Sequence, residues 1–137
     1  MQNLFIDSED TFVVNFVVAT GENNFMMCDV NEEFLKETID KEKEYEIKKY
    51  EIVFKRPSFG ETVELYDSIF SASGNSIDFN PLQARYKKII LLIKEWNLED
   101  AEGNKIDIND KNIRSLHPLI GAVIGVQVDL ETGGSLT

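Results

Sequence analysis

The chain has 137 residues, and its 42% of hydrophobic residues are enough to build the core of a single domain. Asp and Glu total 25 against 14 Lys and Arg, and the resulting charge of −11 argues against binding to the phosphates of a nucleic acid. The longest apolar run, Ile89–Ile93, is far shorter than the roughly 20 residues of a membrane span, so we expect no membrane contact. The acidic balance favours solubility and can steer the protein toward a basic partner.

The first residues predict a strand that returns as a hairpin. Residues 1–4 lack the basic and apolar segments of a signal peptide, which, with a single cysteine, indicates a reducing, cytosolic compartment. Val and Phe dominate residues 11–19, which predicts a buried strand. A turn at 21–24 then returns the chain as a second strand at 25–28.

A short helix and another strand follow. Asn31 is a typical N-cap, and two acidic residues come directly after it, where the helix dipole favours them. Residues 45–54 alternate between apolar and charged side chains, which predicts a strand with one wet face. Lys48 and Lys49 break this alternation, and we interpret the break as a bulge or a turn.

The second half of the chain changes to helical spacing. Ser58 and Glu61 have the spacing of a capping box and open a helix whose apolar residues continue to Phe70. Residues 71–79 are predicted to form a loop, with its turn signal at 73–75.

A longer helix comes next. Asn80 and Pro81 suit its cap and first position, and its broad apolar face extends to about Trp96, which predicts the central helix of the domain. In the polar loop that follows, Ile106 and Ile108 flank an aspartate, so the pattern fits either a small hairpin or an extended lip.

The chain ends in two capped helices and a tail. Asn109 can cap a short helix that carries Ile113, and Pro118 starts a final helix that runs to about Leu130. Residues 131–137 are rich in glycine and predict a flexible C-terminal tail.

The order of these elements indicates the fold class. Strands gather before residue 57 and helices after it, which predicts an α+β fold with an N-terminal antiparallel β-rich part and a C-terminal helical part. We find neither a repeat nor a linker, so residues 1–130 are expected to form one domain.

Few residues offer catalytic chemistry. His117 lies between Leu116 and Pro118 at a helix start, where a histidine more often caps the helix or faces water than acts as a base. Cys28 has no basic neighbour in the sequence that would lower its thiol pKa, so we expect a structural thiol. The loop that begins at Asp100 lacks the sixth-position Gly and twelfth-position Glu of a calcium loop, and one Cys with one His falls short of a zinc site. We therefore expect no metal, no cofactor and no enzymatic activity.

The final helix is apolar on nearly all of its sides. Such a helix must be buried or must meet a partner, and the pattern leaves both readings open. Gly121 and Gly125, spaced as G-x-x-x-G, would leave a smooth strip along it. The residues expected to bind a partner are Leu119, Ile120, Val123, Ile124 and Val126.

The C-terminal half, over roughly residues 52–128, resembles a known family. A Trp-x-Leu sequence leads to an acidic-Gly turn, a capped short helix and a Pro-initiated apolar helix, and this order resembles the small tail assembly chaperones of long-tailed bacteriophages. In many members a β-rich part precedes the helices. The residues that carry the motif are Trp96, Leu98, Asp100, Gly103, Ile113, Leu116 and Pro118.

The resemblance implies a non-enzymatic viral protein of the host cytoplasm that needs no cofactor. It implies that the chain binds the phage tape-measure protein before the tail tube polymerises around it, and then leaves. In many relatives a longer form arises by ribosomal frameshifting near the C-terminus. The alternative is a structural component of the virion, such as a tail, neck or baseplate protein. Whether the chain forms a homo-oligomer stays open.

Overall fold

The computed structural model describes residues 4–39, 41, 43–72 and 81–133. The expected turn at 73–75, the expected cap Asn80 and the end of the tail lie outside these residues.

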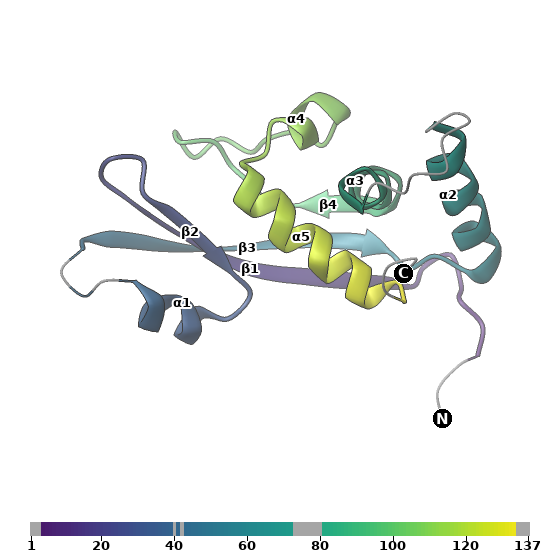
Figure 1. The fold of residues 1–137 in the computed structure, drawn as a ribbon, viewed down its shortest axis with the longest axis horizontal. Helices are drawn as coiled ribbons and strands as arrows, with labels where there is room; N and C mark the ends of the chain where they lie inside the picture. The colour runs from purple at the N-terminus through teal and green to yellow at the C-terminus, as the bar shows by residue number, and fades with distance from the viewer. Residues whose placement is uncertain (1–3, 40, 42, 73–80, 134–137) are drawn as a thin grey trace.

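The described chain forms a four-stranded antiparallel sheet with helices on both faces (Figure 1). The strand order is β2-β1-β3-β4, so β1 and β3 lie at the centre. The strands are β1 (Thr11–Gly21), β2 (Met26–Asp29), β3 (Tyr45–Lys55) and β4 (Ile93–Trp96). Three strands belong to the N-terminal half and most helices to the C-terminal half, which confirms the α+β class.

Five helices accompany the sheet: α1 (Glu32–Thr38), α2 (Phe59–Ala72), α3 (Pro81–Leu92), α4 (Asp110–Arg114) and α5 (Pro118–Glu131). In Figure 1, α5 runs across the front of the sheet, with α3 beside it and α2 beyond α3. α1 contacts the end of the sheet formed by β1 and β2.

Local signals set three of the helix starts as the sequence predicts. The Asn31 side chain accepts a hydrogen bond from the Phe34 amide, and the Asn109 side chain accepts one from the Asn112 amide. The Glu61 amide donates to the Ser58 hydroxyl at 3.2 Å while the Glu61 carboxylate accepts from the Ser58 amide, which completes the capping box.

The two faces of the sheet are buried by different helices. Even-numbered residues of β1 and β3 form the main core with α3 and α5; they are Phe12, Val14, Phe16, Val18, Ile52 and Phe54. Odd-numbered residues at the other end of the same strands form a smaller core with α1; they include Val17, Ala19 and Ile47, which pack with Leu35 and Ile39. In the part of the chain that the structure describes, this second face is open beyond α1, and Val13 is 45% exposed there.

This change of face corrects our interpretation of Lys48 and Lys49. β3 pairs with β1 in unbroken register from Tyr45 to Lys55, so neither a bulge nor a turn interrupts it. The alternation shifts because the buried face changes along the strand, from the α1 side at Ile47 to the α5 side at Tyr50.

The second correction concerns residues 93–96, which we expected in the long helix. The helix ends at Leu92, and the next four residues form β4 against β3, with Trp96 opposite Ile52. An apolar run this short fits a helix and a strand equally well, and the free edge of β3 decides between them. The Trp96 indole then donates to the Ile106 carbonyl at 2.6 Å, which anchors the following loop.

That loop is a small hairpin, held by backbone hydrogen bonds that include those from the Asp100 amide to the Asn104 carbonyl and from the Ile106 amide to the Leu98 carbonyl. Glu99 pairs with Lys105 across a turn in which Gly103 has a φ of +83°. Ile106 and Ile108 come directly after this hairpin, and both pack against the main core.

The smaller core can be tested with two neighbouring residues of α1. Leu35→Ala is expected to lower the free energy of unfolding by about 2–5 kcal/mol because the side chain is fully buried. Phe34→Ala should cost less than about 1 kcal/mol because its ring is 55% exposed. Urea unfolding of both variants measures the difference, and equal losses would mean that α1 does not cover the sheet in this way.

Candidate functional site

α5 begins at a histidine cap. The Nδ1 atom of His117 accepts a hydrogen bond from the Leu119 amide at 3.1 Å, and Pro118 occupies the tolerated first position. This confirms the expectation that His117 caps the helix.

The inner face of α5 completes the main core. Ile124 and Val128 are fully buried there. Ile120 and Val123 are partly buried and pack against the same cluster. Ile124 was among the residues expected to bind a partner; with no exposed surface, it cannot contact one directly.

A buried ion pair joins α5 to α3. The Asp129 carboxylate lies 2.9 Å from the Lys88 Nζ and 2.8 Å from the Arg85 Nε. Lys88 is only 2% exposed, and its Nζ also donates to the Thr132 hydroxyl and lies 5.6 Å from the centroid of the Tyr66 ring in α2. One lysine therefore connects three helices.

The arginine of this cluster explains one glycine of the G-x-x-x-G pair. A Cβ atom placed on Gly125 would lie 3.0 Å from the Arg85 Cδ, so the missing side chain lets the arginine stem lie against α5. Nothing lies within 4 Å of a Cβ placed on Gly121. Of the two glycines in the G-x-x-x-G pair, Gly125 alone allows a close contact within the described part of the chain.

The outward face of α5 carries an apolar surface that we call the outer stripe: Leu119, Ala122, Val123, Val126 and Leu130. Leu119, Val126 and Leu130 are 45%, 40% and 68% exposed, and Val123 is partly buried. The helix has two charged side chains, and both are engaged: Asp129 pairs with α3, and Glu131 pairs with Arg56 at 2.8 Å. The outer stripe therefore contains no charge.

Most residues of the family motif contribute to the core or to the turn before α5. Trp96, Leu98 and Ile113 are buried in the main core, and Leu116 packs against it. Asp100 accepts hydrogen bonds from the backbone amides of its own turn, and these bonds hold the pKa of its carboxyl below its usual value. With Gly103 and Pro118, these residues shape the chain that leads into α5.

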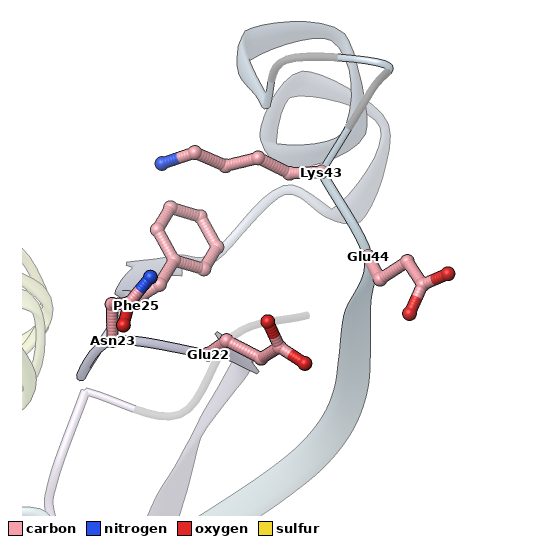
Figure 2. Close-up of a pocket in the computed structure, with 5 residues that line it drawn as sticks. All are labelled: Glu22, Asn23, Phe25, Lys43 and Glu44. Carbon is pink, nitrogen blue, oxygen red and sulfur yellow. The ribbon is translucent and has the colours of Figure 1, made fainter.

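Among the surface hollows in the described part of the chain, two concern the strand ends and the start of α5. Figure 2 shows the first, of about 590 Å³, where Lys43 reaches toward the Phe25 ring beside Glu22, Asn23 and Glu44. The Lys43 Nζ lies 4.4 Å from the ring centroid, so a cation–π contact links its two sides. The second, of about 540 Å³, lies beside the N-terminal end of α5. The sequence gives no sign of the second hollow because its walls come from distant segments.

The remaining reactive group is the Cys28 thiol. Burial, and then the neighbouring Asp29 carboxylate, raise its pKa to about 11, so it is protonated at neutral pH. Its side chain is partly buried and packs against the main core, as expected of a structural thiol.

Two searches of the described part of the chain found nothing. No group of three or more His, Cys, Asp or Glu residues there could hold a metal ion. No helix there has the length and apolarity to cross a membrane.

Comparisons with family models, curated proteins and solved structures find no match to this chain. The resemblance to tail assembly chaperones therefore stands on the motif residues alone.

The buried ion pair generates a stability prediction. Asp129→Asn should lower the free energy of unfolding by about 3–5 kcal/mol because the Lys88 ammonium stays buried without its carboxylate. Glu131→Gln, two residues away, removes an exposed pair and should cost less than about 1 kcal/mol. Chemical unfolding at neutral pH compares the two variants; similar small losses would show that Asp129 does not hold α5 in place.

The thiol generates a pH prediction. Because the pKa of Cys28 is about 11 in the folded protein, its alkylation by iodoacetamide should accelerate about tenfold per pH unit between about pH 8 and about pH 10. In the urea-unfolded chain, where a thiol pKa is about 8.5, the rate should level off above about pH 9. Mass spectrometry of the alkylated protein measures both rates, and identical profiles would contradict the burial of the thiol.

Proposed function

We propose that this chain is a non-enzymatic assembly protein that binds an apolar helical segment of a partner along the outer stripe of α5. The specific role that the resemblance implies is that of a phage tail assembly chaperone, with the tape-measure protein as its client. The observation that carries the proposal is the absence of charge from the exposed face of a helix whose two charged residues both pair with the body of the domain.

The spacing of the outer stripe suits a helix-in-groove partner. From Leu119 to Leu130 the stripe covers three turns and about 16 Å of helix length. Its residues recur every three or four positions, which is the spacing of the contact residues when two helices pack side by side. The small Ala122 lies one turn from the start of the stripe, where a second helix can approach closely.

Burial of the outer stripe against a partner would lower the free energy of the complex. Each buried square ångström of apolar surface contributes about 25 cal/mol, whereas a solvated stripe contributes nothing to stability. A surface with no ion pair to break can exchange partners without the desolvation cost of charged groups. This property suits a protein that holds its client for a time and then releases it.

A structural virion protein is the alternative, and one feature favours it. Leu4 and Phe5, which precede β1, are 90% and 80% exposed. Two adjacent exposed apolar side chains suit a permanent contact with a neighbouring subunit.

The proposal can be tested with two valines of nearly equal exposure. Val126→Glu places a charge in the outer stripe and should reduce recovery of the co-expressed tape-measure protein by at least about tenfold, because the charge would be desolvated on binding. Val13→Glu makes the same change on the open face of the sheet and should leave recovery unchanged. Affinity purification with quantitative mass spectrometry is the measurement, and circular dichroism checks that both variants fold.

Three outcomes would count against the proposal. Equal recovery with both variants would remove the outer stripe from the interaction. Presence of the chain at fixed stoichiometry in purified virions would favour the structural alternative. A homodimer that Val126→Glu dissociates, measured by sedimentation, would make a second copy the occupant.

A further inference from the structure

The hollow beside the N-terminal end of α5 is a continuation of the main core. Its floor comes from β1 and β3, where Phe16 and Tyr50 lie on the same face as the core residues and their rings are 5.7 Å apart. Its walls come from the loop after β4 and from Leu116 and Ile120. The deepest surface is therefore apolar.

The rim of the hollow is polar and carries a negative charge. Along β3, Glu46 and Lys48 precede Tyr50 on the same face, and Glu99 and Asp100 line the hollow from the loop. The Lys48 Nζ lies 3.5 Å from the Glu99 carboxylate, so this lysine is already engaged. Among the residues that the structure describes, Glu46 has no cationic partner. The rim thus has an excess of carboxylate.

The hollow lies at the same end of α5 as the start of the outer stripe. Ile120, which lines the wall, directly follows Leu119, the first residue of the stripe. A partner segment that continues past the start of the stripe would reach the end of α5 where the hollow lies.

We infer that this hollow is an anchor pocket that takes one large apolar side chain of the partner, with a lysine or arginine of the partner at its acidic rim. The inference rests on the proposed function and adds the chemistry of the partner segment. A volume of about 540 Å³ falls within the range of ordinary binding pockets and can receive an aromatic ring. Large side chains that fill a pocket supply much of the energy of a protein interface. Complementary charge at the rim accelerates association and rejects acidic segments.

The pocket can be tested apart from the outer stripe with three short peptides. Capped Lys-Phe-Lys, Lys-Ala-Lys and Glu-Phe-Glu are too short to cover the stripe. Lys-Phe-Lys should bind with a dissociation constant of about 1 mM and shift the methyl resonances of Val18, Leu116 and Ile120. Lys-Ala-Lys and Glu-Phe-Glu should each bind at least about tenfold more weakly, because one lacks the ring and the other repels the rim.

Substitutions locate the site. Ala101→Trp, at an exposed position on the mouth of the pocket, should abolish the shifts by filling it. Glu46→Lys should weaken Lys-Phe-Lys binding about tenfold by reversing a rim charge. Glu37→Lys, the same change on exposed α1, is the matched control and should have no effect.

Each outcome separates this inference from the proposed function. Absence of methyl shifts with Lys-Phe-Lys, or equal binding of all three peptides, would overturn the pocket even if Val126→Glu still blocks the tape-measure protein. Tighter binding of Glu-Phe-Glu than of Lys-Phe-Lys would overturn the inference that the partner segment is basic. Binding that survives Ala101→Trp would place the peptide elsewhere.

Discussion

The arrangement of this domain depends on the buried contact between Lys88 and Asp129. The ammonium group is almost completely removed from water, so it needs the carboxylate of α5 close by. A rotation of α5 that turned the outer stripe inward would carry the Asp129 carboxylate away from the buried Lys88 ammonium. Arg85, which lies against Gly125 and binds the same carboxylate, adds a second constraint on the rotation. The ion pair thus determines which face of an almost uniformly apolar helix is exposed.

The lengths of the elements explain the rest of the surface. β1 and β3 each have 11 residues and extend about 36 Å, whereas the 14 residues of α5 extend about 21 Å. α5 is shorter than these strands, and a pocket remains beside its N-terminal end. On the opposite face, α1 packs against one end of the sheet. The pocket and the first residue of the outer stripe therefore lie at the same end of α5.

Local signals in the sequence predict much of the fold, and distant contacts determine what they miss. The caps at Asn31 and Asn109 are readable because their partners lie three residues away. Residues 93–96 were expected in a helix because only the edge of β3, far away in the sequence, makes them a strand. The outer stripe was only partly predictable: the sequence shows an apolar helix, but Ile124 faces the core because of a lysine 41 residues from Asp129, and Lys88 itself reads as a surface charge.

The central proposal is that the outward face of α5 is covered by a helical partner. Hydroxyl-radical footprinting of the chain, free and in complex with the co-expressed tape-measure protein, tests it most directly. We predict that labelling of Leu119, Val126 and Leu130 falls in the complex while labelling of Val13, exposed on the opposite face of the sheet, stays the same. Unchanged labelling along α5, or protection of Val13 instead, would contradict the proposal.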